Sequence, residues 1–249
     1  MASVPIDDPR TDDGVERVLT VTAHPDDIDF GAAGTIASFV RAGMEVTYCV
    51  CTDGDAGGFD DEVPRSDIPR IRREEQVAAA RAIGVEDVRF LGYTDGELYV
   101  THELRYDISR VIRQVRPQRM LIQSPERNWE RIPSAHPDHL AAGEAAIFAI
   151  YPDARNPYAH PTLRTEESLD AWTVHQVWVM AAPFEHQNHW VDITDTFDDK
   201  VRALRAHESQ TGHWADLEQR LGSWGEEIAQ RGGLPAGRRA EVFRVTRVP

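Results

Sequence analysis

The feature that most constrains the fold of this chain is a regular alternation of β-rich runs with helical patterns. The predicted strands are residues 17–23, 45–52, 87–92 and 119–124, and the predicted helices between them are residues 31–43, 71–84 and 103–115. Successive strand–helix–strand units form right-handed crossovers and place their strands parallel and side by side. We therefore predict an α/β fold, Rossmann-like, with a mainly parallel sheet and helices on both faces.

The length of the chain and its later pattern favour a single domain. A chain of 249 residues with 41% hydrophobic content can bury one sizeable core. After residue 140 the predicted elements are a helix to Ile150, a strand near Val174–Met180 and helices near residues 198–207 and 216–230. We predict one domain over residues 15–249. Residues 1–14 are polar and acidic, without the features of a signal peptide, and are expected to form a disordered tail.

Charge and hydropathy exclude two classes of partner. The chain has 27 basic and 42 acidic residues, a net charge of −15, and Lys200 is its only lysine. A basic face that tracks phosphates would have to be assembled from scattered arginines, so nucleic acid is not expected as a partner. No apolar run approaches the roughly 18 residues that span a bilayer. We expect a cytoplasmic protein that acts on a small molecule, with a homo-oligomer left open.

Two clusters of histidine and aspartate follow strands of the predicted sheet. His-Pro-Asp-Asp at residues 24–27 directly follows the first strand, and His-Pro-Asp-His at residues 136–139 follows the fourth strand and a loop. Because ligands of open α/β sheets bind beyond the carboxyl ends of the strands, both clusters are expected at one rim. A hydrolytic zinc site needs three histidine or carboxylate ligands and an open position, together with a base and an oxyanion donor. The two clusters supply more groups than metal binding needs, which favours hydrolysis.

A purely structural explanation of these residues is helix capping. The aspartates at residues 26 and 27 would cap the helix predicted near Gly31, and Asp138 would cap a helix beginning near His139. Capping explains either cluster alone about as well as a site does. It explains two such clusters at one rim less well.

The chain resembles the LmbE-like or PIG-L family of zinc-dependent N-deacetylases through these two clusters, AHPDD at residues 23–27 and HPDH at residues 136–139. Further segments resemble secondary signatures of that family: TDGDAGG (52–58), RREE (72–75), LGYTDGEL (91–98), VDIT (191–194) and HESQ (207–210). The resemblance covers roughly residues 17–210. One departure is Ile28, where the family often has glutamate.

The resemblance implies a metal-dependent amide hydrolase that removes an N-acetyl group from an N-acetylglucosamine-type conjugate with a metal-activated water. One Zn²⁺ per chain is implied, with other divalent metals possible, and its implied ligands are His24, Asp27 and His139. Asp26 would be the general base. His136 would stabilise the oxyanion or protonate the leaving amine, and Asp138 would orient an imidazole.

Four residues are predicted to contact the substrate. Arg72 and Asp95 match positions that the resemblance associates with sugar contacts. Asp55 lies in the glycine-rich loop expected to border the pocket, and His189 precedes the VDIT segment. For Arg72, a solvated helix charge paired with a neighbour on the same helix explains the sequence equally well.

Two other functions compete with deacetylation. Two histidines and one carboxylate also form the facial triad of non-haem iron oxygenases, although the strand–helix alternation disfavours that class. A sugar- or metal-binding module without turnover is the non-enzymatic alternative. The presence of Asp26 beside Asp27 and of His136 beside His139 argues against it.

Overall fold

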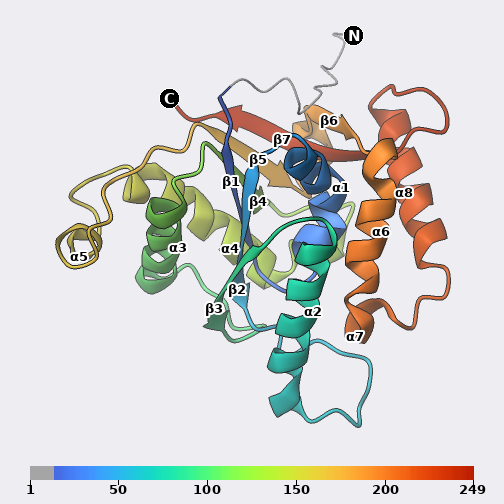
Figure 1. Cartoon of the computed structure of the whole chain (residues 1–249), viewed down its shortest axis with the longest axis horizontal. Coiled ribbons are helices and arrows are strands. Elements are labelled where there is room, and N and C mark those ends of the chain that lie inside the picture. Colours follow the sequence, from blue (N-terminus) through green and yellow to red (C-terminus); the bar gives the residue numbers. More distant parts are fainter. Residues whose placement is uncertain (1–13) are drawn as a thin grey trace.

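The computed structural model describes residues 14–249, which form one α/β domain around a seven-stranded sheet in the order β3-β2-β1-β4-β5-β7-β6 (Figure 1). The strands are β1 (Arg17–Thr22), β2 (Glu45–Thr52), β3 (Asp87–Tyr93), β4 (Arg119–Gln123), β5 (Gln176–Met180), β6 (His189–Asp192) and β7 (Ala240–Arg247). The helices are α1 (Asp27–Arg41), α2 (Ile68–Ala82), α3 (His102–Val115), α4 (Pro137–Phe148), α5 (Pro161–Thr165), α6 (Phe197–Arg205), α7 (Glu208–Thr211) and α8 (Leu217–Arg231). The predicted fold class is confirmed. The predicted tail at residues 1–14 lies, except for Gly14, outside the described residues.

The central strands are parallel, as predicted from the alternation. β1 pairs in parallel with β2 and with β4, so that Val21 lies opposite Cys49 on one side and Ile122 on the other. β3 and β5 extend the sheet in the same direction. The carboxyl ends of β1 and β4 are therefore neighbours, and the segments that leave these two strands begin at the same edge.

The far edge of the sheet is antiparallel and was not predicted. β7 runs antiparallel between β5 and β6, with Met180 and His189 both opposite Phe243. β6 has only four residues and follows a loop, so its alternation is too short to be recognised from sequence.

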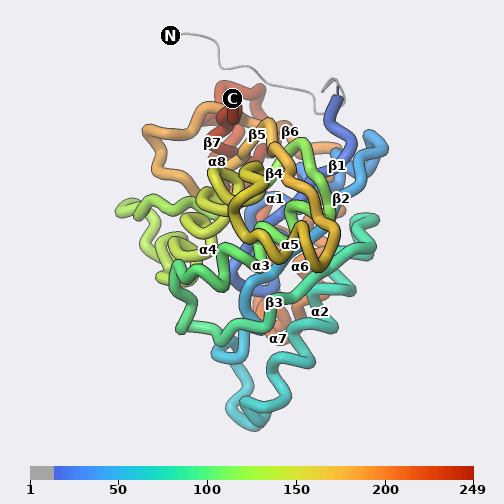
Figure 2. The backbone as a smooth tube through the Cα atoms, turned by 90° about the vertical axis from the view of Figure 1, so that its left-hand side faces the viewer, coloured from blue at the N-terminus to red at the C-terminus, as the bar shows by residue number. Residues whose placement is uncertain are grey.

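Two apolar clusters cover the two faces of the sheet. Figure 1 shows α1, α2, α6 and α8 on one side and α3, α4 and α5 on the other, and Figure 2 views the molecule from the α3–α5 side. Successive side chains of β1 point to opposite faces of the sheet, so Val18 belongs to one apolar cluster and Leu19 to the other. Cys49 and Cys51 are buried free thiols in the apolar cluster that contains Leu19.

Helix α1 packs very closely on its neighbours. A Cβ atom on Gly34 would lie 2.8 Å from Ile193, so only glycine allows this approach. The helix also begins at Asp27 instead of at the predicted Gly31, which places the end of the first cluster inside its first turn. None of the helices between residues 14 and 249 combines the length and apolarity that crossing a membrane requires.

Candidate active site

Hydrogen bonds join the strand ends from which the two clusters emerge. The Ala23 amide donates to the Gln123 side chain at 2.8 Å, which ties the end of β1 to the end of β4. The Thr52 hydroxyl donates to the Ala23 carbonyl at 2.9 Å, which ties in the end of β2. The chain turns at Pro25 into α1, and Pro137 begins α4. The topology thus brings both clusters together at one rim, as predicted.

Three side chains from the two clusters, His24, Asp27 and His139, form a compact triangle. His24 Nδ1 lies 3.3 Å from Asp27 Oδ2 and 3.2 Å from His139 Nε2, and His139 Nε2 lies 3.1 Å from Asp27 Oδ1. Tetrahedral zinc, with bonds of about 2.0–2.1 Å, keeps its ligand atoms about 3.3 Å apart. The donor types and their spacing therefore fit a divalent metal of that size.

The other ring nitrogens of both histidines are engaged elsewhere. His24 Nε2 lies 3.0 Å from Asp95 Oδ1 and 3.1 Å from Asp138 Oδ2. His139 Nδ1 lies 3.4 Å from the Ser134 carbonyl. These partners orient each ring and leave one nitrogen facing the triangle, an arrangement typical of metal-binding histidines. The carboxylate of Asp95 lies beside His24, and the predicted contact of Asp95 with substrate stays a prediction.

The negative charge of this site favours a cation. Burial disfavours a charged imidazole, but the carboxylates of Asp27, Asp138 and Asp95 outweigh it and raise the pKa of His24 to about 12. Burial likewise opposes ionisation of Asp27, but His139 and His24 hold the pKa of that carboxyl well below its usual range. Both shifts come from the pairing of imidazoles with carboxylates in a small buried volume.

Asp26 has an unusual backbone conformation, and its side chain is not part of this triangle. It has φ of 87°, in the left-handed region, and its amide donates to the Gln76 side chain at 2.8 Å. Its carboxylate lies 3.2 Å from Arg72 Nη2. Burial raises the pKa of Asp26 to about 6, although Arg72 opposes the shift. Asp26 occupies the N-cap position of α1, but its side chain makes no capping hydrogen bond, so the capping explanation is wrong here.

A buried polar network that the sequence did not predict supports Asp26. Gln76 donates to Asp29 Oδ2 at 2.8 Å, and His207 Nε2 lies 2.8 Å from the same oxygen. All three side chains belong to residues with no exposed surface. In the sequence, Gln76 directly follows RREE and His207 begins HESQ. Nothing in these two segments indicates that the residues contact Asp29.

The Arg72 side chain is buried next to Asp26 and does not extend into solvent. Only 4% of its surface is exposed, and its guanidinium donates to the carbonyls of Pro25 at 2.5 Å and Gly54 at 3.1 Å. A Cβ atom on Gly57 would lie 2.3 Å from Arg72 Nη1, so the glycine-rich loop wraps closely around this side chain. The solvated-charge explanation is wrong. The contacts of Arg72 are to protein carbonyls and to Asp26, and its predicted sugar contact stays a prediction.

Of the other two predicted substrate residues, Asp55 lies beside the His and Asp clusters and His189 lies apart from them. Asp55 accepts a hydrogen bond from the Asp95 amide at 2.8 Å and pairs with Arg65 at 2.7 Å, so it joins the glycine-rich loop to the Asp95 segment. His189 is buried on β6, and its ring packs on Trp178 with centroids 4.5 Å apart. His189 is not brought to the cluster.

His136 presents one nitrogen to the site. Its Nδ1 accepts a hydrogen bond from the Asp138 amide at 3.2 Å and caps α4, so a neutral ring carries its proton on Nε2. Asp138 itself is the second residue of that helix and does not cap it, contrary to the capping explanation. The His136 ring stands edge-on to His24, with centroids 4.9 Å apart. The Nε2–H group is therefore available as a hydrogen-bond donor beside the triangle.

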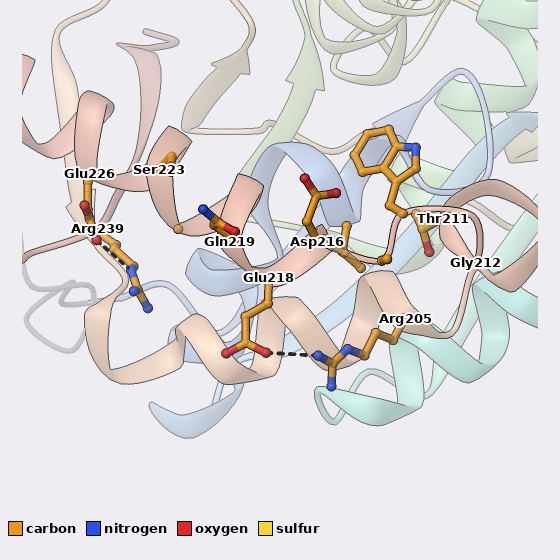
Figure 3. Close-up of a pocket in the computed structure, with 13 residues that line it drawn as sticks. Arg205, Thr211, Gly212, Asp216, Glu218, Gln219, Ser223, Glu226 and Arg239 are labelled. Atoms are coloured by element: carbon orange, nitrogen blue, oxygen red, sulfur yellow. Dashed lines mark hydrogen bonds and ion pairs between the residues drawn. The ribbon is translucent and has the colours of Figure 1, made fainter.

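A cavity of about 320 Å³ adjoins the triangle and is lined by Asp27 and His139. A larger hollow of about 720 Å³ lies along α8 and shares no residue with the two clusters (Figure 3). Four of its charged groups pair with each other, Arg205 with Glu218 at 2.9 Å and Arg239 with Glu226 at 3.6 Å (Figure 3). The smaller cavity is therefore the candidate substrate site.

Comparisons with known proteins agree with this arrangement. The family model described as GlcNAc-PI de-N-acetylase (PIG-L) matches residues 19–150, which include both clusters. Diacetylchitobiose deacetylase of Thermococcus kodakarensis is 34% identical over 206 residues, 82% of this chain and 73% of that protein. A probable N-acetyl-alpha-D-glucosaminyl L-malate deacetylase 2 of Bacillus cereus is 34% identical over 202 residues, 78% of this chain and 84% of that protein. The solved structure of N,N'-diacetylchitobiose deacetylase from Pyrococcus horikoshii superposes with a TM-score of 0.85 and 29% identity, covering 97% of this chain and 87% of that one.

Proposed function

This chain belongs to the GlcNAc-PI de-N-acetylase (PIG-L) family, and on that premise we propose that it is a zinc-dependent hydrolase of an N-acetylglucosamine-type conjugate. The substrate loses its N-acetyl group as acetate and keeps a free amine. The observation that carries the proposal is the separation of two adjacent aspartates. Asp27 faces both histidines of the triangle, whereas Asp26 pairs with Arg72.

His24 Nδ1, the Asp27 carboxylate and His139 Nε2 would hold the metal. When bound, the metal supplies a Lewis acid that polarises the amide carbonyl and lowers the pKa of water. Asp95 and Asp138 keep His24 in the orientation that this requires, through their contacts with its Nε2.

Asp26 is the general base in this proposal. Arg72 engages its Oδ2, which leaves Oδ1 to take a proton from the attacking water. Burial raises the pKa of Asp26 to about 6, which makes its carboxylate a stronger base than an exposed one. The proton is then delivered to the departing amine nitrogen, which balances the hydrolysis.

His136 stabilises the charge that develops on the carbonyl oxygen. Its Nδ1 is occupied by a backbone amide, so the Nε2–H donates to the oxyanion of the tetrahedral intermediate. Such a donor contributes on the order of 3 kcal/mol to transition-state stabilisation in other hydrolases.

The test is acetate release from a panel of N-acetylglucosaminides, with and without a chelator, on the wild type and two matched variants. Asp27→Ala should lose the metal and the activity. Asp26→Ala should keep stoichiometric metal and lose activity by at least about 100-fold, in line with the usual contribution of general bases. Retention of metal by both variants would contradict this division of roles. Absence of release from every substrate, despite bound metal, would favour a binding module.

The names of the relatives leave the rest of the substrate open. They include a neutral disaccharide and a conjugate with malate, which carries carboxylates. Family membership alone therefore does not decide whether the group attached to the sugar is neutral or charged.

A further inference from the structure

Two arginines line the cavity that reaches Asp27 and His139. Arg131 lies in the loop after β4, and Arg231 is the last residue of α8. Among residues 14–249, neither guanidinium has a carboxylate oxygen within 4.0 Å. Desolvation and the positive charge of Arg231 lower the pKa of Arg131, with Glu227 opposing them, so the two arginines act on each other electrostatically.

This arrangement is unusual for a chain with 42 acidic and 27 basic residues. The one other lysine or arginine side chain that lines the cavity, Lys200, is neutralised by Glu241 at 2.6 Å. Two neighbouring cations without an acidic partner repel each other, and an anion placed between them removes that cost. The cavity is therefore lined both by Asp27 and His139 of the proposed metal site and by two arginines without a carboxylate partner.

Each of the two guanidinium groups lies over an aromatic ring. The guanidinium carbon of Arg131 lies 5.7 Å from the Trp224 ring centroid, and that of Arg231 lies 4.3 Å from the Phe184 centroid. Both aromatic residues also line the cavity, and Trp224 and Phe184 are 37% and 44% exposed. A guanidinium that contacts a ring by its face keeps its N–H edges free for bidentate contact with a carboxylate or phosphate.

We propose that Arg131 and Arg231 form a subsite for a carboxylate or phosphate group on the part of the substrate beyond the acetamido sugar. This inference rests on the proposed function, because it assumes that the acetamido group sits at His24, Asp27 and His139. One cavity of about 320 Å³ is lined by Asp27 and His139 as well as by both arginines, so one molecule can contact all four residues. The enzyme then selects anionic conjugates over neutral ones.

The experiment compares kcat/KM for acetate release from three substrates: neutral diacetylchitobiose, N-acetylglucosaminyl malate and N-acetylglucosamine 1-phosphate. The wild type should prefer at least one anionic substrate by about 10-fold or more, and the anion preferred tells whether carboxylate or phosphate is recognised. In the variant Arg131→Gln/Arg231→Gln the ratio of anionic to neutral rates should fall to about one. Arg220→Gln, which changes an arginine of α8 that pairs with Asp216, is the matched control and should keep the wild-type ratio.

A second readout separates this inference from the proposed function. Calorimetric titration of L-malate alone, and of inorganic phosphate alone, should show binding to the wild type and at least about 10-fold weaker binding to the double variant. If the wild type and the double variant both deacetylate all three substrates with equal kcat/KM, the proposed anion subsite is overturned, but the proposed deacetylase function is not. If no substrate is deacetylated, the proposed function fails, and the titrations still decide whether the arginines bind an anion.

Discussion

The adjacent residues Asp26 and Asp27 have different surroundings because one of them has a left-handed backbone. Asp27 lies between two imidazoles, whereas Asp26 is held by a guanidinium and by an amide hydrogen bond. Non-glycine residues with positive φ are uncommon and cost about 1 kcal/mol or more, so they persist where their surroundings hold them. At this position the holding group is the side chain of Gln76.

Replacement of Gln76 by methionine tests this role at the residue scale. Methionine has a similar length but cannot accept the Asp26 amide hydrogen bond or donate to Asp29. We expect kcat to fall about 10-fold, equivalent to roughly 1.4 kcal/mol, with metal content unchanged, because the proposed metal ligands stay in place. Steady-state kinetics and metal analysis measure the two effects.

The control for Gln76→Met is Glu74→Gln on the same helix. Glu74 is exposed and pairs with Arg70 one turn away, so its replacement should leave kcat unchanged. An unaltered kcat in Gln76→Met would show that Gln76 does not position the base. If Gln76→Met also lost metal, the substitution would be acting on Asp27 instead of on Asp26.

The sequence could predict the two His and Asp clusters but not the residues that support them. The clusters are continuous in sequence and follow strands, so topology alone brings them together. The supporting contacts join Asp29 to Gln76 across 47 residues and to His207 across 178 residues. No local pattern connects such positions, and a buried glutamine looks like any other residue of an amphipathic helix.

At the scale of elements, a buried ion pair joins the unpredicted strand β7 to two helices. Lys200 on α6 donates to Glu241 on β7 at 2.6 Å and to the Phe30 carbonyl at 2.7 Å. Glu241 also accepts hydrogen bonds from the Gly34 and Thr35 amides of α1. The only lysine of the chain thus lies where α1, α6 and β7 meet.

We expect Lys200→Met to lower the free energy of unfolding by about 3–5 kcal/mol, because it leaves the buried Glu241 carboxylate without its cation. The double variant Lys200→Met/Glu241→Gln should recover part of this loss, since no uncompensated charge remains. Urea denaturation measures both changes. Arg205→Ala breaks the exposed pair with Glu218 and should change stability much less; equal effects in the buried and exposed pairs would refute the argument.

The parallel strands and their helices were predicted because each has its own hydrophobic period and a clear end. β7 was not, because it pairs antiparallel with β5 and β6, whereas the strand–helix alternation predicts parallel pairing. The start of α1 was also misplaced. Asp26 and Asp27 look like loop residues, and the left-handed turn that begins the helix at Asp27 leaves no mark in the sequence.

At the scale of the whole molecule, the proposed metal would join the two sides of the sheet. Asp27 belongs to α1, on the face covered by α1, α2, α6 and α8, and His139 belongs to α4 on the opposite face. His24 lies at the end of β1 between them. The two apolar clusters are extensive and contain none of these ligands, so the fold itself does not depend on the metal.

Removal of the metal should therefore lower the thermal stability without unfolding the protein. A ligand at 100 times its Kd stabilises the native state by about 2.7 kcal/mol, which for a chain of this size raises Tm by roughly 5–10 °C. We expect a chelator to lower Tm by this amount while the far-ultraviolet circular dichroism at 25 °C stays the same. Asp27→Ala should melt like the chelated wild type and be insensitive to chelator, whereas Asp26→Ala should keep the wild-type shift. Loss of secondary structure on chelation at 25 °C would show instead that the metal is required for folding, and an unchanged Tm would show that no metal occupies the triangle.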